Sequence, residues 1–363
     1  MKLQQHHLQD LASGAAFLAT GGGGDPFLSL LCAQQAIKQF DAAELISIDA
    51  LPDDAAIVAV GSVGAPTTSL ELLPSIDDPA IAMRAFERHT GLNIDAVVSF
   101  EIGGANSLIP IVAAAAAGIP VIDGDGMGRA LPEVQMMTYS IAGISPTPSI
   151  AVDYAGNTAT FEGITVLEYE EQIREFAMAR GGMVTTVEFG MNAGQLRSCL
   201  VPDTVSLAIS IGEVLRIDRG NAAQLIDRLQ PLFAPTPYGE MRILFSGTVA
   251  DVATSVVGGY DIGFALLRSD RDPTKQIKVD IKNEYLTVWD GPKLLASVPD
   301  LITFVDTETG QPINSERLSF GQRVTIVGIG CPPHFRTADA LAVVGPRCFG
   351  FDFDFTPIEQ LLA

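Results

Sequence analysis

The fold is decided by residues 96–126, which read AVVSFEIGGANSLIPIVAAAAAGIPVIDGDG. A short apolar strand is followed by a glycine-rich loop, an alanine-rich helix and a second apolar strand at 119–122. This order is typical of a βαβ unit, in which a crossover helix joins two parallel strands. Strands and helices also alternate upstream, with strands at 45–48 and 56–60. The first half of the chain is therefore predicted to be an α/β domain with a mainly parallel sheet.

The second half follows a different pattern. A hairpin is expected at 149–161, and beyond Gly239 short apolar stretches separated by turn residues predict many strands. Residues 341–344 and the alternating segment 349–355 are among these predicted strands. We predict a β-barrel or β-sandwich for this part of the chain. Between the two regions the pattern predicts a strand at 184–189 and helices at 168–180, 203–217 and 221–230.

The composition limits the class of protein. At 363 residues the chain is long enough for two domains, which we place at 1–166 and 167–363. A net charge of −21 argues against nucleic acid or an anionic membrane as a partner, because both favour basic surfaces. No apolar stretch is long enough to span a membrane, no secretion signal is evident, and the four cysteines are scattered. We expect a cytoplasmic homo-oligomer.

Three glycine-rich loops in the first third of the chain carry carboxylates: ATGGGGDP at 19–26, EIGGAN at 101–106 and DGDGMGR at 123–129. Glycine lets a backbone approach a ligand closely, and ligands of open α/β sheets bind where strands end. The loops are therefore expected to meet in one polar pocket that holds Glu101, Asp123, Asp125 and Arg129. The residues expected to contact the substrate are Gly22, Gly23, Gly24, Gly103, Gly104, Asn106 and Gly126.

Each polar residue of these loops has a structural alternative. Glu101 directly follows a buried strand, where a carboxylate is usually paired or functional. Asp123 and Asp125 suit a metal ion or a shared proton, but one of them can cap the next helix while the other faces water. Arg129 can pair with a neighbouring carboxylate or hold a substrate carboxylate in a bidentate fork. Asn106 can cap the following helix or bind a ligand amide.

The glycine run at 21–24 can cradle an anion at the start of the next helix, or form a flexible corner before a helix that Asp25 caps. It lacks the Lys-Ser/Thr pair of a phosphate-binding loop. The loop at 124–128 is one residue short of the dinucleotide pattern Gly-x-Gly-x-x-Gly, so no nucleotide cofactor is expected. Cys331 and His334 have the spacing of two metal ligands, but an exposed loop is the favoured interpretation because zinc sites show more ligands nearby.

These loops and several segments of the second half resemble the S-methyl-thiohydantoin desulfurase family. In the first half the resemblance is carried by GGGGDP at 21–26, EIGGANS at 101–107 and PVIDGDGMGRALPE at 120–133. In the second half it is carried by IKNE at 281–284, PDLI at 299–302, FGQRV at 320–324 and VGPRCFG at 344–350. The resemblance extends over nearly the whole chain, and this combination of segments is specific.

The resemblance implies an α/β N-terminal domain and a mostly β C-terminal domain. It also implies hydrolytic removal of sulfur from a thiohydantoin ring, metal-assisted in at least some members, during the breakdown of hydantoin-like compounds. A small ring substrate is therefore expected, together with a hydantoinase- or oxoprolinase-type partner, because members often occur beside such proteins. From the clustered carboxylates we hypothesise that a divalent ion (zinc or similar) on Asp123 and Asp125 activates water, and that Glu101 is the general base. Arg129 or Asn106 orients the ring.

Two other functions remain open at this point. A hydrolase that opens or trims an amide ring without touching sulfur would use the same carboxylates and the same oriented water. A non-catalytic subunit that binds a ligand, or that bridges to a hydantoinase-like enzyme, would need the carboxylates for binding alone. Product analysis separates the two hydrolases, and a protein that binds without turnover identifies the subunit.

Overall fold

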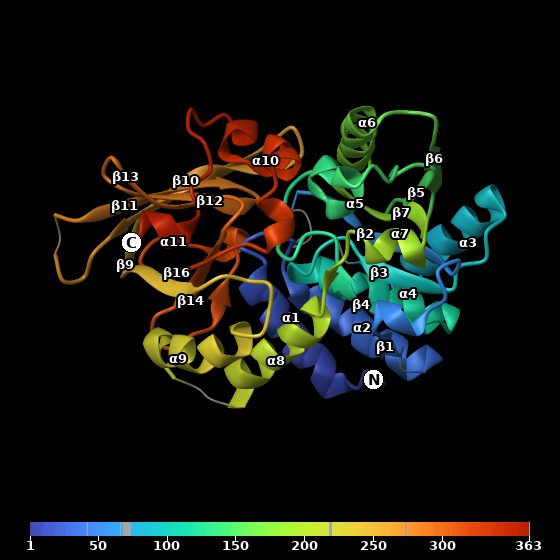
Figure 1. The fold of residues 1–363 in the computed structure, drawn as a ribbon, viewed down its shortest axis with the longest axis horizontal. Coiled ribbons are helices and arrows are strands. Elements are labelled where there is room, and N and C mark those ends of the chain that lie inside the picture. The colour runs from blue at the N-terminus through green and yellow to red at the C-terminus, as the bar shows by residue number, and fades with distance from the viewer. Residues whose placement is uncertain (42, 66, 68–73, 218–219, 273, 363) are drawn as a thin grey trace.

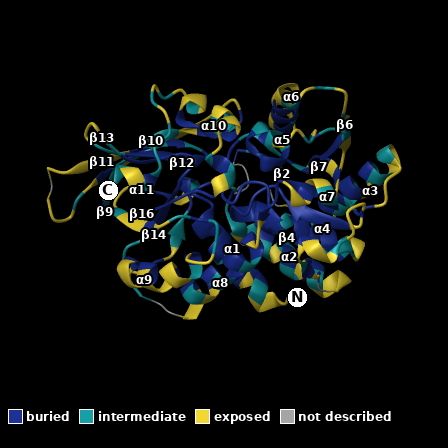
Figure 2. Cartoon of the chain, in the orientation of Figure 1, coloured by how far each residue is buried: buried dark blue, intermediate teal, exposed yellow. Residues whose placement is uncertain are grey.

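The computed structural model describes residues 1–41, 43–65, 67, 74–217, 220–272 and 274–362. They form two β-sheets that lie next to each other, with helices packed around and between them (Figure 1). Buried residues fill the interior of both halves and the region where the halves meet (Figure 2). Among the helices that these residues form, none combines the length and the apolar character needed to span a membrane.

The N-terminal sheet has eight strands in the order β1-β4-β3-β2-β7-β5-β6, with β8 paired to β4. The first four strands of this order run parallel, and the other pairs are antiparallel. The predicted α/β class is confirmed. β7 and β8 show that this sheet also takes strands from beyond residue 166. The bounds are β1 Leu45–Ile46, β2 Ala56–Gly64, β3 Ala96–Ser99, β4 Val121–Asp125, β5 Ser149–Val152, β6 Thr158–Phe161, β7 Met183–Asn192 and β8 Val201–Pro202.

Local sequence signals explain where several helices begin and end. The carboxylate of Asp25 accepts the N–H of Phe27 at 2.9 Å, and Pro26 occupies the first helical position of α2. Helix α3 ends at Gly91, whose φ of 75° is a left-handed conformation that glycine adopts without strain. The helices are α1 Gln5–Leu18, α2 Pro26–Phe40, α3 Asp78–Thr90, α4 Ile109–Ala117, α5 Thr138–Ile141, α6 Val166–Ala179, α7 Ala193–Arg197, α8 Thr204–Ile217, α9 Ala222–Phe233, α10 Ala338–Val344 and α11 Ile358–Leu361.

The C-terminal sheet is antiparallel throughout, in the order β13-β12-β11-β10-β9-β16-β14-β15. Within the described residues its two end strands are not paired with each other, so the sheet does not close and the barrel alternative is wrong. β12 and β13 also contact β14, so the sheet curls around one core, as in a sandwich. The bounds are β9 Met241–Val257, β10 Tyr260–Arg268, β11 Gln276–Lys282, β12 Glu284–Asp290, β13 Lys293–Ser297, β14 Leu301–Asp306, β15 Pro312–Ile313 and β16 Arg323–Ile329.

Two predicted strands near the C-terminus are wrong. Residues 341–344 belong to helix α10, which begins where the Thr337 hydroxyl accepts the N–H of Ala340. The alternating segment 349–355 has no strand partner in the described chain. Its aspartates fold back onto Arg347, and Phe353 packs edge-on against Trp289 with ring centroids 5.4 Å apart. The alternation therefore reflects phenylalanines that pack partly buried and aspartates that stay exposed, an arrangement that does not require a strand partner.

Helix α1 joins the two halves. It crosses α8 so closely that a side chain at Gly14 would overlap the carbonyl group of Ala208, and one at Gly212 would overlap that of Asp10. On its other side α1 contacts β14 and β15 of the C-terminal sheet, and the Thr303 hydroxyl donates to the carbonyl of Phe17 at 2.7 Å. Figure 1 shows α1 between the two halves, with α8 beside it. The glycine loop that follows α1 is thereby placed at the boundary of the domains.

Candidate active site

The three glycine-rich loops meet at the boundary between the two sheets. The N–H of Ala105 donates to the carbonyl of Gly23 at 2.9 Å, which joins the first loop to the second. The third loop contacts the second, because a side chain at Gly103 would overlap Ala130. The first loop also receives the backbone N–H of Tyr285 from the C-terminal sheet, at 2.8 Å on Thr20. The predicted convergence of the loops is therefore observed, and β12 joins them.

Most of the glycines serve this close packing. A side chain at Gly23 would overlap the carbonyl of Gly103, and one at Gly104 would overlap the carbonyl of Gly24. Gly126 lies against Phe100 and Tyr139 in the same way. Of the seven residues expected to contact the substrate, the pocket at the domain boundary is lined by Gly23, Gly24 and Asn106, whereas Gly22, Gly103, Gly104 and Gly126 lie behind its walls.

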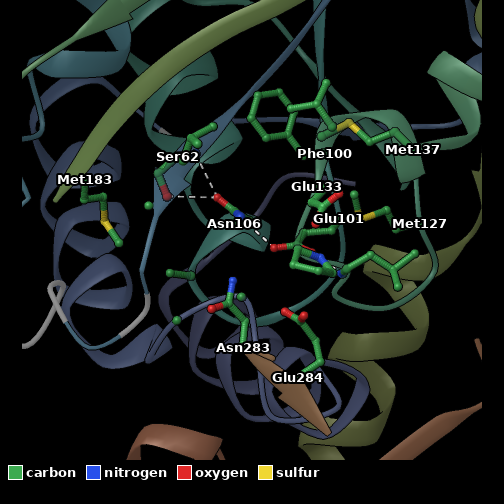
Figure 3. A pocket seen from close by; sticks show the side chains of 18 of the residues that line it. Ser62, Phe100, Glu101, Asn106, Met127, Glu133, Met137, Met183, Asn283 and Glu284 are labelled. Atoms are coloured by element: carbon green, nitrogen blue, oxygen red, sulfur yellow. Dashed lines mark hydrogen bonds between the residues drawn. The ribbon is translucent and has the colours of Figure 1, made fainter. Parts of the chain in front are cut away.

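The pocket encloses about 600 Å³ of space not filled by protein atoms, part of it open to solvent. We call it the interdomain pocket, because the N-terminal domain supplies Glu101 and Asn106 and the C-terminal sheet supplies Asn283 and Glu284. Figure 3 shows these four side chains around one space. Its apolar walls include Phe100, Met127, Leu131, Val134, Met137 and Met183. Apolar walls with a few convergent polar groups are typical of a small-molecule site.

Hydrogen bonds fix the position of Glu101 from two sides. The side-chain amide of Asn106 donates to Oε1 of Glu101 at 2.7 Å, and the N–H of Leu131 donates to Oε2 at 3.1 Å. Asn106 is itself held in one orientation, because its Oδ1 accepts both the N–H and the hydroxyl of Ser62, at 2.9 and 3.1 Å. Figure 3 shows this chain of bonds from Ser62 to Glu101. Asn106 therefore orients a carboxyl group, a role that the sequence did not indicate.

Burial changes the acidity of Glu101. The side chain is almost completely enclosed, and this desolvation raises its pKa to about 8, against the favourable bonds from Asn106 and Leu131. Near neutral pH the group is therefore mostly protonated, but a small rise in pH ionises it. A pKa close to the working pH is what a general acid or base requires.

Glu284 is a second buried carboxyl group in the interdomain pocket. Its pKa is raised well above the ordinary value, first by burial and then by the charge of Glu101. Its Oε2 has no hydrogen-bond partner among the described residues. A side chain at Gly22 would overlap the Glu284 carboxyl, so glycine at this position makes room for it. This residue was missed as a site residue, although it ends the IKNE segment that carries the family resemblance.

The backbone at Asn283 directs Glu284 into the pocket. Asn283 is the single residue between β11 and β12, and its φ of 57° is left-handed, a conformation that asparagine tolerates better than most residues. Its N–H donates to the carbonyl of Asp261 at 2.7 Å, and its Oδ1 accepts the N–H of Asp261 at 2.8 Å. The Ser315 hydroxyl donates to the Asn283 carbonyl at 2.5 Å. These bonds hold the tight turn that precedes Glu284.

Arg129 lies outside the pocket walls. It is completely buried, and its guanidinium donates to the Thr20 hydroxyl at 2.7 Å and to the carbonyls of Pro299 and Asp300 at 2.9 Å each. Burial lowers its pKa to about 10, and the charge of Glu284 is the first of the groups that oppose this. The arginine therefore ties the third loop to the C-terminal domain, and its hydrogen-bonding groups are not directed at a ligand.

Asp123 and Asp125 also lie outside the pocket walls. Oδ1 of Asp123 accepts the N–H groups of Val205 and Ser206, at 3.1 and 3.0 Å, in the first turn of α8. Oδ1 of Asp125 accepts those of Met127 and Gly128, at 2.5 and 2.6 Å, and thereby shapes the third loop. In the part of the chain that the structure describes, no three His, Cys, Asp or Glu side chains are grouped to hold a metal ion. This pair does not fit a resident metal.

The interdomain pocket offers no free cation on its described walls. Arg174 lines it, but its three nitrogens donate to Glu170 at 2.7 Å, Gly259 at 3.1 Å and Pro132 at 2.8 Å, and its guanidinium stacks 4.0 Å from the centre of the Tyr260 ring. With two buried carboxyl groups and no unpaired positive charge, these walls suit a neutral ligand.

Cys331 and His334 do not form a metal site in the described chain. Cys331 is buried, and burial raises its thiol pKa. Its N–H donates to Asp300 at 2.8 Å. The backbone around Cys331 thus supports the segment that binds Arg129. The expected exposed loop is wrong at Cys331, which is buried, and His334 is only partly exposed.

Fold and site together define a two-domain protein with a small-molecule pocket where an α/β sheet meets an antiparallel sheet. Comparison with protein-family models identifies two matches: the S-Me-THD-like N-terminal domain over residues 6–163 and the S-Me-THD-like C-terminal domain over residues 165–358. The chain belongs to the S-Me-THD-like family, which confirms the suspected relationship to S-methyl-thiohydantoin desulfurases.

The fold is also that of a crystal structure of a protein from Chromobacterium violaceum. The TM-score is 0.82 at 22% sequence identity, and the match covers 99% of this chain and all of the other chain. At this identity the likeness concerns the fold alone. No curated protein matches the chain.

Proposed function

We propose that the protein hydrolyses S-methyl-thiohydantoin-type rings, releasing a thiol and leaving a hydantoin. The observation that carries this proposal is the pair of buried carboxyl groups, Glu101 and Glu284, which come from different domains and enter one apolar pocket. Family membership supports the substrate class. The absence of a free cation on the described walls supports a neutral ring.

The two carboxyl groups divide the acid and base roles because their environments differ. Glu101 receives two N–H bonds that favour its charged form, whereas Glu284 has an oxygen without a described partner and a pKa raised well above normal. As pH rises, Glu101 therefore loses its proton first, and Glu284 keeps its own. Two titratable groups whose environments give them different pKa values are commonly the base and the acid of a site.

The reaction then balances with water as the only co-reactant. The Glu101 carboxylate takes a proton from water as the water oxygen bonds to C2 of the ring, and Glu284 donates its proton to the ring nitrogen that was double-bonded to C2. The C2–S bond of the tetrahedral intermediate breaks, C2 becomes a carbonyl, and the proton on the added oxygen leaves with the thiol. Glu284 recovers its proton from Glu101 through the product or water. Asn106 holds Glu101 in place throughout.

A divalent metal and a hydantoinase-type partner remain part of the proposal as expectations from the family. A homo-oligomeric state remains part of it because most enzymes of this kind form symmetric oligomers. Because Asp123 and Asp125 do not fit a resident metal, no step above depends on one. The functional assay should therefore be run before and after chelator treatment, and sedimentation of the purified protein measures its oligomeric state.

The test is release of methanethiol from S-methyl-thiohydantoins, measured with a thiol reagent. We expect turnover by the wild-type protein and a roughly 10²- to 10⁴-fold lower kcat in Glu101→Gln and in Glu284→Gln, the usual effect of removing a general acid or base. Product analysis that shows ring opening with sulfur retained would favour the amide-hydrolase alternative. Binding of the ring without any product would favour the non-catalytic subunit.

A further inference from the structure

A second cavity adjoins the interdomain pocket, and the mechanism above does not use it. Three residues, Ser62, Ala105 and Met183, line both cavities, so the two lie on either side of them. The second cavity, which we call the side cavity, encloses about 790 Å³ of space not filled by protein atoms, part of it open to solvent. It lies among α2, α4, β5 and β7, within the N-terminal domain.

The described walls of the side cavity are mainly aliphatic. Val112, Val152 and Val184 are buried, and Cys32 lies half-buried on α2. The other aliphatic wall residues are Leu28, Pro74, Pro79, Ala105, Ile109 and Met183. Binding of an apolar group in such a cavity is favourable because it removes apolar surface from water. Each methylene that is buried increases the affinity about three- to fourfold.

The two charged residues on the described walls of the side cavity, Asp25 and Asp78, are both acidic. Asp25 is bonded to Arg317 and is therefore neutralised, but Asp78 makes no ion pair with a described residue. Burial is the largest of the causes that raise the pKa of Asp78, to about 6, so it is mainly charged at neutral pH. An anionic group placed here would meet this carboxylate without a free cation on the described walls to compensate. The carboxylate therefore disfavours an anionic group, and the aliphatic walls favour an uncharged alkyl group.

The boundary between the two cavities is close to the carboxyl pair. Ser62 is bonded to Asn106, which is bonded to Glu101, so the side cavity begins two hydrogen bonds away from the proposed base. Ala105 leaves space because its side chain is a single methyl group. Met183 has three rotatable bonds, and such a side chain adapts to what is placed beside it. Figure 3 shows Ser62 and Met183 on the same side of the interdomain pocket.

We propose that the side cavity binds the substituent on C5 of the ring, and that this substituent is an uncharged alkyl group. This inference rests on the proposed function, because it places the ring in the interdomain pocket. C2 and C5 are not neighbours in the five-membered ring. C2 can therefore face the carboxyl groups while the substituent on C5 extends past Ser62 and Ala105.

The experiment measures binding and turnover along one homologous series. Calorimetry with hydantoins that carry hydrogen, methyl, propyl and butyl at C5 gives the affinities, and methanethiol release from the matching S-methyl-thiohydantoins gives kcat/KM. For the wild-type protein we expect about a three- to fourfold gain per methylene until the cavity is full. A 5-carboxyethyl hydantoin is expected to bind more weakly than the butyl compound.

Two variants reshape the cavity in opposite directions. Cys32→Phe should fill it and remove the gain for propyl and butyl while leaving the unsubstituted ring unchanged. Ile109→Ala should enlarge it and move the optimum to longer chains. Gln35→Phe is the matched control: it places the same side chain on the exposed face of α2 and should retain the wild-type series.

The outcomes separate the two proposals. The proposal that the side cavity binds the C5 substituent is overturned by either of two results. One is an affinity that does not depend on chain length in the wild-type protein, and the other is a dependence that is the same in the wild-type and Cys32→Phe proteins. Tighter binding of the carboxyethyl compound overturns the assignment of an uncharged substituent, and no binding by any alkylhydantoin overturns the inference as a whole. If calorimetry shows that affinity rises with chain length but no thiol is released, the proposed reaction fails, whereas binding of the C5 substituent in the side cavity stands.

Discussion

At the scale of single residues, the environment of each carboxylate is more informative than its position in a motif. Glu101 follows strand β3, whereas Asp123 and Asp125 lie at the end of β4, and all three are in glycine-rich segments. In the folded chain one oxygen of Asp123 and one of Asp125 accept backbone N–H groups away from the pocket, whereas Glu101 lies on its wall. The structure thus divides three similar acidic residues into two that shape loops and one that faces a ligand site.

The pH dependence of the reaction follows from the pKa of Glu101. The base must be ionised, and its pKa is about 8. We therefore expect kcat/KM to rise with pH from 6 to about 8 and then to level off, and to fall at higher pH once Glu284 loses its proton. Asn106→Ala should move the inflection upward, because the amide N–H favours the charged form. A profile that is flat between pH 6 and 9, or an inflection unaltered in Asn106→Ala, would contradict the assignment of the base.

Asp125 is expected to matter for stability more than for proton transfer. Asp125→Ala leaves the buried N–H groups of Met127 and Gly128 without their acceptor, at a cost of about 1–3 kcal/mol each. Chemical denaturation should therefore show a free energy of unfolding lower by about 2–6 kcal/mol. At temperatures where the variant is folded, its activity should keep a pH inflection, moved slightly downward because the negative charge of Asp125 raises the pKa of Glu101. Loss of turnover in a variant of unchanged stability would instead restore Asp125 as a catalytic residue.

The site could be predicted from the sequence only in part. Glu101 and the meeting of the three loops followed from the pattern of strands and glycines. Glu284 did not, because it comes from the second half of the chain and reaches the pocket only through tertiary packing around Gly22. The glycines were misleading for a physical reason: a missing side chain admits a neighbouring backbone as readily as a ligand.

At the scale of elements, the crossing of α1 and α8 is the most tightly packed contact described above. Two glycines, one from each helix, allow the backbones to touch at two points. Helix boundaries elsewhere in the N-terminal domain were predictable, since caps such as Asp25 and Gly91 act within one turn. The crossing itself was not, because it depends on residues almost 200 positions apart.

Gly212→Ala should disturb this crossing. Its new methyl group would overlap the carbonyl of Asp10, and overpacking of this kind costs about 1–3 kcal/mol. Thermal and chemical denaturation should both report the loss. Glu213→Ala, at the exposed neighbouring position, should remain within about 0.5 kcal/mol of the wild-type protein. Equal stability of the two variants would show that the helices separate without cost.

At the scale of the whole molecule, the pocket exists only because two domains meet. Arg129 is the residue that joins them most directly, since it bonds to Thr20 on one side and to Pro299 and Asp300 on the other. Its charge also favours the ionised forms of Glu101 and Glu284. One buried cation thus supports both the domain boundary and the acidity of the site.

Arg129→Met tests this double role. Breaking the buried contacts should lower the free energy of unfolding by about 3–5 kcal/mol. The pH inflection of kcat/KM should move upward, because the positive charge that lowers the pKa of Glu101 is gone. Arg347→Met, which removes an exposed arginine paired with Asp352 and Asp354, should change neither quantity. An Arg129→Met protein with wild-type stability and pH profile would refute the role given to this residue.

The position of β7 in the N-terminal sheet also bears on the order in which the chain folds during synthesis. β7 lies between β2 and β5, yet it is made after both of them. Until residue 192 has left the ribosome, the facing edges of those two strands have no partner, and unpaired edges promote aggregation. The first sheet is therefore completed only after the second half of the chain has begun to emerge, so slow translation before β7 would prolong the vulnerable stage.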